Sequence, residues 1–382
     1  MLEYGEEQDF KYIVNIKVIG VGGGGNNAVR HMMNSDMKGI DFWVANTDSQ
    51  SLASFNKENR IYLGQNLTKG LGAGANPEIG KKAAIESEDA IKTALRGADM
   101  VFIAAGMGGG TGTGAAPIIA KISKELGALT VAVVTTPFGF EGAKRRAFAS
   151  EGLQELRPNV DSIIVVSNET LLQMFGNIPM SDAFTKANDI LMQSVRAITS
   201  LVSDKALINL DFADIRNIMF EKGSAMIGMG KGFGENKAKD AANLAISSPL
   251  LGSTLKGAKN AIVNITGGTT MTLHDANEAV ELVREAAGDN INIIFGVSID
   301  DTSTLSDRED DYMCVTVIAT EFSNTNHTRI SLDTTLQSFI EPKPVQVEEP
   351  KPSVEIKKDE DLMEENEGID IDFALPSFLR RR

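Results

Sequence analysis

The sequence contains a single cysteine, fewer bases than acids, and no long uninterrupted apolar run. With only Cys314, no disulfide can form within the chain, which fits a reducing cytosol. The 37 Lys and Arg against 52 Asp and Glu give a net charge of −15, which argues against general nucleic-acid binding because that function needs a dense basic surface. Glycines or charges interrupt the most apolar stretches, and residues 1–10 are too acidic and polar for a secretory signal. We therefore expect a cytoplasmic protein with no nucleic-acid partner and no direct membrane insertion.

Histidine is also scarce. His31, His274 and His327 are scattered along the chain and have none of the spacings that metal ligands use. No Ser–His–Asp arrangement can be recognised either. The sequence therefore predicts no metal site built from protein side chains.

Glycine, in contrast, is abundant and concentrated in two loops. Loop one is residues 20–27 (GVGGGGNN), and loop two is residues 106–114 (GMGGGTGTG). Each follows an apolar strand-like run, residues 12–19 or 100–105, and each leads into a helix-like run. A turn of this kind presents unpaired backbone N–H groups and the positive end of a helix dipole, which together bind phosphate. Two such loops predict a nucleotide with several phosphates that is held from two sides.

The rest of the pattern predicts an α/β fold with a Rossmann-like parallel-sheet domain over residues 11–180. The predicted strands are 13–19, 42–46, 100–105, 129–135 and 162–167, and the predicted helices are 27–33, 78–95, 114–126 and 141–156. Strands that alternate with helices favour a parallel sheet covered on both faces. Ligands of such sheets bind at the carboxyl ends of the strands, where both glycine loops lie.

A long central helix is predicted over residues 181–204, and a connecting segment with acidic residues over 205–222. Its apolar residues recur at helical spacing: Phe184, Ala187, Leu191, Val195, Ile198 and Val202. A second, smaller α+β domain is expected over residues 223–322, with strands at 261–265, 291–297 and 312–320 and helices at 235–246 and 275–287. We interpret the glycine-rich segment 228–232 (GMGKG) in this domain as a turn.

Beyond the second domain the composition changes. Residues 323–368 are acidic, punctuated by prolines and poor in large apolar side chains, which predicts a disordered linker. Residues 369–382 combine apolar and basic side chains after this tether, which predicts a short docking peptide for a partner protein. Its contact residues would be Ile371, Phe373, Leu375, Phe378, Leu379 and Arg380.

Two other nucleotide-binding patterns compete with this interpretation. Gly20, Gly22 and Gly25 satisfy G-x-G-x-x-G, so an NAD-dependent oxidoreductase of the Rossmann type remains an alternative, with Asp48 as its ribose ligand. That hypothesis leaves loop two unexplained. Residues 74–82 (GANPEIGKK) superficially resemble a P-loop, but the spacing is one residue too long and no Ser or Thr follows the lysine.

Several motifs resemble those of one known family. GGGTGTG in loop two closely resembles the tubulin-type motif GGGTG[ST]G. The motifs GVGGGGNNAV, NTD (46–48), GLGAGANP (70–77), PFGFEG (137–142), NLDFAD (209–214), ITGG (265–268) and the ending LPSFLRR are similar to those of the FtsZ family, the bacterial tubulin-like cell-division GTPases. The resemblance runs from about residue 11 to residue 322 and resumes at the tail.

The resemblance implies a GTP/GDP site, with Mg²⁺ alongside the triphosphate. Loop one would line the nucleotide with Gly23, Gly24, Gly25, Asn26 and Asn27. Gly110, Thr111 and Gly112 would hold the β- and γ-phosphates, Glu141 and Arg145 would reach the ribose and phosphate region, Phe184 would stack on the base, and Asn188 would contact guanine. The neighbouring Asp189 is the alternative guanine contact, since both side chains offer the acceptor that the N–H groups of guanine need.

Neither loop contains a group that could orient the attacking water, which phosphoryl transfer requires. The candidates are Asn209, Asp211 and Asp214 in NLDFAD, beyond the long helix. About twenty-three helical residues rise by roughly 35 Å, so we expect these residues to act on the nucleotide of a different subunit, as the resemblance also implies. A head-to-tail contact of this kind does not close and produces filaments.

The resulting hypothesis is a self-assembling GTPase whose protofilaments form the cytokinetic ring at mid-cell, on the inner face of the membrane. Its tail would recruit a membrane-tethering adaptor and regulators of division. The alternatives are the oxidoreductase described above and a structural filament protein that binds nucleotide without hydrolysing it.

Overall fold

The computed structural model describes residues 14–322, apart from residues 36, 38, 177, 203–205, 209, 252–254, 256, 289 and 300–310. Asn209, the predicted linker (323–368) and the predicted docking peptide with Ile371, Phe373, Leu375, Phe378, Leu379 and Arg380 lie outside the described residues. Within the described part of the chain, no helix combines the length and the apolar character needed to cross a membrane.

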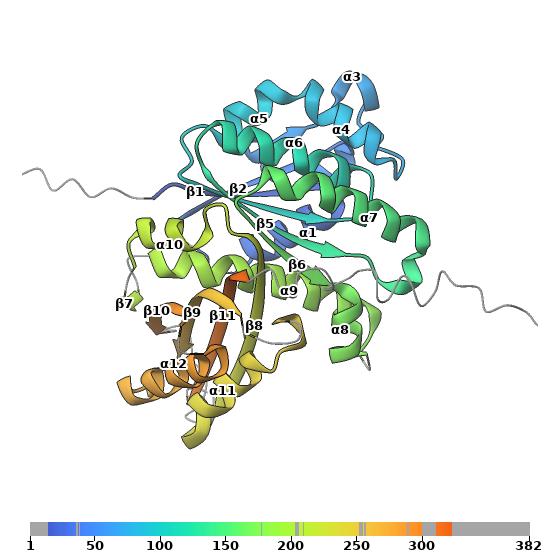
Figure 1. Ribbon diagram of the computed structural model, residues 1–382. Helices are drawn as coiled ribbons and strands as arrows, with labels where there is room; N and C mark the ends of the chain where they lie inside the picture. Colours follow the sequence, from blue (N-terminus) through green and yellow to red (C-terminus); the bar gives the residue numbers. More distant parts are fainter. Residues whose placement is uncertain are drawn as a thin grey trace, which may run out of the picture. The chain divides into compact units, whose positions relative to one another are not determined.

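The described strands form one sheet in the order β3-β2-β1-β4-β5-β6-β8-β11-β9-β10-β7 (Figure 1). Their bounds are β1 Ile16–Val21, β2 Ile40–Asn46, β3 Arg60–Tyr62, β4 Met100–Gly106, β5 Leu129–Thr136, β6 Ser162–Ser167, β7 Ala206–Ile208, β8 Gly223–Phe233, β9 Ala258–Gly267, β10 Asn292–Ile299 and β11 Tyr312–Phe322. The pairs from β3 to β6 are all parallel, which confirms the predicted parallel-sheet domain.

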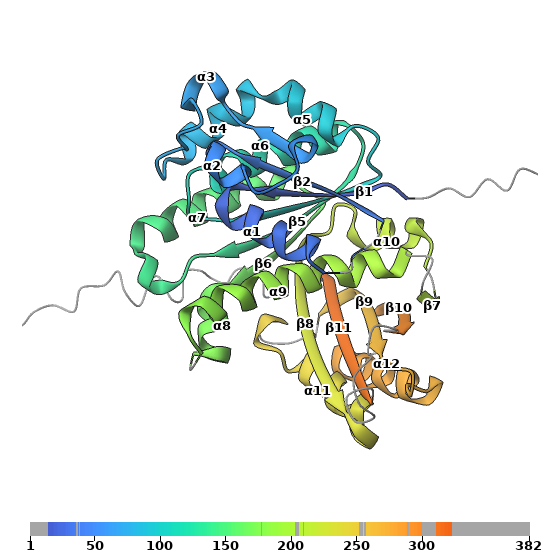
Figure 2. The ribbon, with the colours of Figure 1, turned by 180° about the vertical axis from the view of Figure 1, so that it is seen from behind.

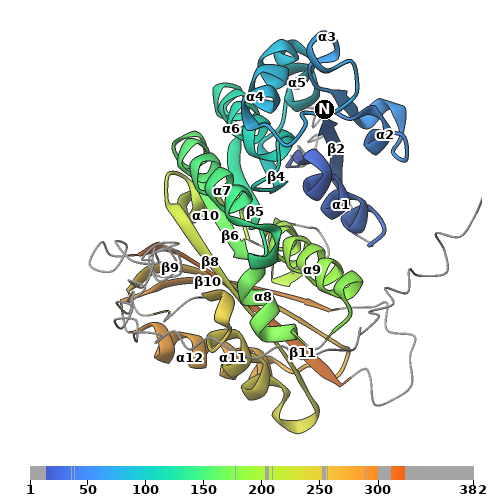
Figure 3. The same cartoon turned by 90° about the vertical axis from the view of Figure 1, so that its right-hand side faces the viewer.

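The helices of the parallel half lie on both faces of the sheet. Their bounds are α1 Gly22–Met33, α2 Ser49–Leu52, α3 Gln65–Thr68, α4 Pro77–Glu86, α5 Glu88–Leu95, α6 Thr111–Glu125, α7 Ala143–Leu156, α8 Asn168–Phe175, α9 Met180–Thr199 and α10 Phe212–Met219. Alternate residues of β4 divide between the two cores: Val101 and Ile103 pack with α4 to α7, whereas Phe102 and Ala104 pack with α1 and α9. Figure 3 shows α1 and α9 on one side of the strands and α4, α6 and α7 on the other. This arrangement explains why the strands are almost continuously apolar.

The predicted helix over residues 78–95 is two helices, α4 and α5, which meet at Ser87. The hydroxyl of Ser87 accepts a hydrogen bond from the Gly64 amide at 2.9 Å and donates to the Tyr62 carbonyl at 3.2 Å. A serine that bonds to a neighbouring strand and loop competes with the helical pattern, and the helix is interrupted there.

The second half of the sheet is mixed and carries two helices, α11 Lys237–Ile246 and α12 Leu273–Ala287. β8 pairs parallel with β6 over three residues and antiparallel with β11, so the two halves share one sheet. One face packs against α11 and α12, and the other contributes Ile227, Ile262 and Ile318 to the core around α9. Figure 1 shows α9 crossing between the two halves. The fold therefore has the predicted long central helix and the smaller α+β unit.

The interpretation of residues 228–232 as a turn is wrong, because these residues lie inside β8. Gly228, Gly230 and Gly232 alternate along the strand and face α11, and a Cβ atom at Gly230 would collide with the carbonyl oxygen of Ala241. Glycine is required here because the helix lies directly on the strand. Cys314 lies in β11, where burial raises the pKa of its thiol.

The end of the second half is held by a charged cluster at Glu321 of β11. Its carboxylate accepts hydrogen bonds from Lys222 at 2.8 Å, Lys259 at 2.9 Å and the amide of Asn260 at 2.9 Å. The hydrogen bonds from the two ammonium groups, that of Lys222 first, lower the pKa of Glu321 to about 2. Because the pKa in the folded protein lies below its ordinary value of 4.5, the cluster stabilises the fold above that value and loses its contribution as the pH falls toward 2.

We predict that Glu321→Gln lowers the free energy of unfolding at pH 7 by about 1 kcal/mol, a value reduced for solvent screening because a third of the side chain is exposed. The difference from the unmodified protein should shrink as the pH falls below 4.5. Urea unfolding followed by circular dichroism at several pH values measures it. Glu285→Gln, at an exposed position of α12, is the matched control and should change little; an equal loss in both variants would refute a specific role for the cluster.

Candidate functional site

The two glycine loops meet at the carboxyl edge of the parallel sheet. The prediction of a separate loop at residues 20–27 before a helix at 27–33 is wrong, because β1 ends at Val21 and α1 begins at Gly22; loop one is the end of β1 and the first turns of α1. Loop two joins β4 to α6. Gly22 has a φ of +71°, and a Cβ atom there would lie 2.7 Å from the backbone nitrogen of Gly112. A Cβ atom on Gly112 would in turn lie 2.6 Å from the carbonyl oxygen of Gly106. Only glycine permits this approach of two backbones, which places both helix starts at one site.

A cavity of about 420 Å³ opens beside the loops, a size in the roughly 300–1,000 Å³ range of small-molecule sites. Elements from the whole carboxyl edge contribute to it. The lining residues are Gly23, Gly24, Asn27, Gly106, Met107, Gly109, Gly110, Thr111, Gly112, Thr135, Pro137, Glu141, Arg145, Asn168, Phe184, Ala187, Asn188 and Leu191.

Ten of the twelve residues predicted to bind nucleotide line this cavity. The two others, Gly25 and Asn26, lie behind its surface. Gly25 packs against the carbonyl group of Ala104 in β4, and Asn26 is 2% exposed. Their position fits a contribution to the packing of α1 on the sheet.

The end of the cavity formed by loop two carries backbone donors and hydroxyl groups. α6 begins at Thr111, so the amides of its first turn have no partner within the helix. The Thr111 hydroxyl lies 2.6 Å from that of Thr47, and the Thr113 hydroxyl accepts a hydrogen bond from Gly108 at 2.8 Å. Helix start, glycines and hydroxyls together favour phosphate at this end.

The opposite end is aromatic. Phe184 packs edge-to-face on Phe138, with 5.3 Å between ring centroids, and remains 44% exposed. Asn188 follows one helical turn later on the same side of α9 and also lines the cavity. A partly exposed ring beside an amide suits a planar base with hydrogen-bonding edges.

Glu141 and Arg145 close one side of the cavity and form an ion pair with each other. Glu141 also accepts a hydrogen bond from the Phe138 amide at 2.9 Å, so its carboxylate is held in place. The side chain of Arg145 is 52% exposed, and its guanidinium can turn toward an anion.

Asn168 is a residue that the sequence interpretation missed, together with Thr135 and Met107. It is the first residue of α8, immediately after β6, and it is 6% exposed. Its side-chain oxygen is buried without a hydrogen-bond partner among the described residues. Because the residue lines the cavity, its amide side chain is a candidate contact for a ligand. Its place at the carboxyl end of a predicted strand was the signal that could have identified it.

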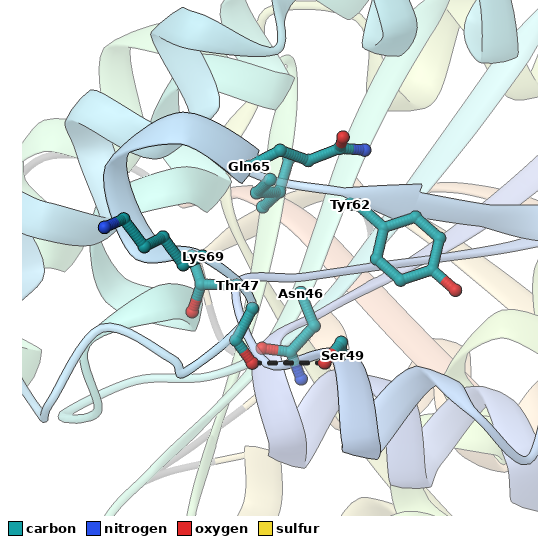
Figure 4. Close-up of a pocket in the computed structure, with 8 residues that line it drawn as sticks. Asn46, Thr47, Ser49, Tyr62, Gln65 and Lys69 are labelled. Atoms are coloured by element: carbon teal, nitrogen blue, oxygen red, sulfur yellow. Dashed lines mark hydrogen bonds between the residues drawn. The ribbon is translucent and has the colours of Figure 1, made fainter.

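A second cavity, of about 440 Å³, lies behind Thr47. Figure 4 shows Asn46, Thr47, Ser49, Tyr62, Gln65 and Lys69 around it. Ser49 donates a hydrogen bond to the carbonyl oxygen of Gly70 at 3.2 Å across this region. Thr47 lines this cavity and Thr111 lines the first, so their paired hydroxyls form a wall common to both.

Asp48 has a structural position that disfavours the NAD alternative. Its carboxylate accepts hydrogen bonds from the Gln50 amide at 2.9 Å and the Ser51 hydroxyl at 2.6 Å, which cap α2. The bond from Ser51 lowers the pKa of Asp48. Asp48 is absent from the lining of the cavity, where an NAD enzyme would need a ribose ligand.

The acidic candidates lie elsewhere in the chain. Asp211 precedes α10 and Asp214 lies in its first turn; both are exposed, and neither lines the cavity. Asn209 lies outside the described residues. Glu141 is the one carboxylate among the lining residues, and it is already engaged by Arg145 and the Phe138 amide.

Comparisons with known proteins agree with this geometry. Residues 15–176 match the model of the Tubulin/FtsZ family, GTPase domain, and residues 223–323 match that of the FtsZ family, C-terminal domain. The structure described as an empty FtsZ dimer from M. jannaschii is 40% identical, with a TM-score of 0.77 over 81% of this chain and 89% of that chain. Two proteins from Haloferax volcanii share the fold. They are CetZ1, described as a GDP-bound monomer (19% identical, TM-score 0.69, 85% of this chain and 100% of that chain), and CetZ2, described as a GTPgS-bound protofilament (20%, 0.68, 85% and 98%).

We predict that Asn168→Ala weakens GDP binding by about 5- to 30-fold, because the change removes an amide that lines the cavity and leaves a hydrogen-bonding group of the ligand without a partner. The dissociation constant is measured by calorimetry on dilute protein. Thr170→Ala, two residues further along α8, is the control and should bind normally. Unchanged affinity in Asn168→Ala would exclude the proposed contact.

The two family models together span most of the chain, and 14 of the 18 residues that line the cavity lie in the part that the GTPase-domain model matches. The chain therefore belongs to the Tubulin/FtsZ family, carries an FtsZ-type C-terminal domain, binds GTP and GDP, and is a GTPase.

Proposed function

We propose that this GTPase assembles head to tail, and that each hydrolytic site is completed by the next subunit. The observation that carries the proposal is the separation of the cavity from the free acids. The cavity offers groups for phosphate and base but no free carboxylate, whereas Asp211 and Asp214 are exposed outside it. Phosphoryl transfer needs a group that orients the attacking water.

The length of α9 between Phe184 and the acids of α10 supports catalysis by acids that come from a neighbouring subunit. From Phe184 to the end of α9 the helix rises by roughly 22 Å, and α10 follows beyond that end. In Figure 1, α10 and β7 lie at the left, whereas the strands of the parallel sheet run toward α7 and α8 on the right. The acids of one subunit would therefore meet the nucleotide of its neighbour more readily than its own.

Exposed apolar side chains also support a head-to-tail contact between subunits. Leu71 is 86% exposed and belongs to the loop that packs around Gly110 through Ala73 and Asn76. Leu207, on the edge strand β7, is 67% exposed. Apolar groups on two different surfaces suit a heterologous interface, which extends into a filament instead of closing. Relatives described as a dimer and as a protofilament support assembly of this type.

Mg²⁺ is expected to accompany the triphosphate. The described residues contain no group of three side chains that could hold a metal ion, which fits Mg²⁺ because this ion keeps several waters and binds mainly to substrate phosphates. The hydroxyls of Thr111 and Thr135 line the cavity and would complete its shell. When bound, the ion neutralises charge on the β- and γ-phosphate oxygens.

At the cellular level we propose a cytokinetic ring at the division site, under the membrane. Membership of the family supports this role. The tail residues Ile371 to Arg380 would bind a membrane-tethering adaptor and other division proteins. A random-coil chain of about 45 residues, the length of the predicted linker, spans roughly 35–40 Å, and many tails on one filament would bind with avidity.

The decisive measurement is GTP turnover per molecule against protein concentration. We expect almost no turnover in dilute protein and a rise above a threshold concentration. Asp214→Ala should bind GTP and sediment as polymer but release phosphate at least about 100-fold more slowly, as when a positioned catalytic group is lost. Asp240→Ala, an exposed acid of α11, is the control. Full turnover in a strictly monomeric preparation would disprove the proposal.

The apolar contact has its own test. Leu71→Asp places a charge in the proposed interface, so polymer and turnover should both fall by at least about tenfold while GDP binding is kept. Leu244→Asp, on α11, is matched because Leu244 is 53% exposed, and it should assemble normally. Normal sedimentation of Leu71→Asp would remove this residue from the interface.

A further inference from the structure

α1 connects the phosphate end of the cavity to the helix that carries the base contacts. It begins at loop one and ends at Met33, and Figure 2 shows it alongside α9. Close to its end, Nε2 of His31 lies 2.6 Å from Oδ1 of Asp189, and both side chains are 31% exposed. The other carboxylate oxygen of Asp189 lies 3.5 Å from Nζ of Lys186. His31 thus lies closer to the carboxylate of Asp189 than Lys186 does.

Asp189 is the residue after Asn188, and only one of the two lines the cavity. Successive residues of an α-helix point about 100° apart, so the rotation of α9 about its axis decides which side chain faces the ligand. His31 holds the Asp189 side chain on the side of α9 that faces α1. Asn188 therefore lies on the side of α9 that lines the cavity, as does Phe184, which precedes it by one helical turn.

The two side chains would treat a purine differently. An amide offers both a donor and an acceptor, whereas a carboxylate is charged and only accepts. Guanine carries N–H donors on N1 and on the 2-amino group, beside the acceptor O6. A small rotation of α9 therefore changes which hydrogen-bond donors and acceptors of the protein face the base, and so changes which base is bound best.

We infer that His31 is a positioning residue for base selectivity. By binding Asp189 it keeps this carboxylate away from the cavity and sets the rotation of α9 at which Asn188 faces the base. The inference rests on the guanine contact proposed for Asn188.

The test compares the dissociation constants of GDP and inosine diphosphate, which lacks the 2-amino group, on dilute full-length protein. His31→Ala should weaken GDP binding by about three- to tenfold and lower the GDP preference over inosine diphosphate by about threefold, the loss expected for one misplaced hydrogen bond. His31→Gln keeps a nitrogen donor, so it should restore most of the GDP affinity and most of the preference for GDP over inosine diphosphate. Lys186→Ala removes the longer contact and should leave the preference unchanged.

A double-mutant cycle separates positioning from general damage. Asp189→Ala should reproduce the loss of preference, and adding His31→Ala to it should cost nothing further, because both changes break one contact. Equal weakening of both nucleotides, or normal binding of both, in His31→Ala and Asp189→Ala would overturn the inference. Thermal unfolding verifies that each variant is folded, and Asp189→Ala carries the test if His31→Ala does not fold.

Asn188→Ala separates the positioning role of His31 from the guanine contact of Asn188. If it loses the preference for GDP while His31→Ala keeps it, the positioning role of His31 fails and the guanine contact stands. If Asn188→Ala keeps the preference, the proposed guanine contact fails, and the role of His31 fails with it.

Discussion

The close approach of the two glycine loops is the constraint on which the site depends. Gly22 and Gly112 bring the backbones of loop one and loop two together, so α1 and α6 begin at the same point of the sheet edge. A side chain at Gly22 would force the two loops apart, and one at Gly112 would collide with the backbone of loop two itself. The N-termini of α1 and α6 would then lie too far apart to bind the same ligand. The positive ends of their dipoles could not stabilise the same phosphates. The backbone of the two loops forms the site, and side-chain contacts such as the one between the hydroxyls of Thr47 and Thr111 then fix the positions of individual groups in it.

The continuous sheet and α9 set the distance between the two ends of the molecule. β8 extends the parallel sheet into the mixed half, and α9 packs against both halves. The cavity between the glycine loops and Phe184 therefore lies at one end of α9, and the acids of α10 follow its other end. The rigidity of this connection favours catalysis that is shared between neighbouring subunits, since a single chain would have to break its core to bring the two parts together.

Much of the parallel half was predictable, because β1, β4, β5 and β6 are nearly continuous apolar runs, each followed by a helical pattern; the short strand β3 (Arg60–Tyr62), which has no such pattern, was missed. The prediction failed where glycine had a packing role. Gly230 in β8 appears in the sequence as part of a turn, but it is the point where α11 lies on the strand. Ser87 was equally hidden, since its bonds to Gly64 and Tyr62 come from residues more than twenty positions earlier. Residues whose role depends on a distant partner carry no local signal.

The sequence by itself predicted two glycine-rich loops at strand ends, and the family resemblance of its motifs supplied ten residues that line the cavity. Local chemistry is sufficient to predict the loops, since a strand, a glycine turn and a helix start are consecutive in the chain. Only the tertiary structure decided that Asn188 faces the cavity while Asp189 contacts His31, and that the side-chain oxygen of Asn168 is buried there without a partner among the described residues. Both outcomes depend on how helices rotate and pack, and packing is set by contacts between segments that are far apart in the sequence.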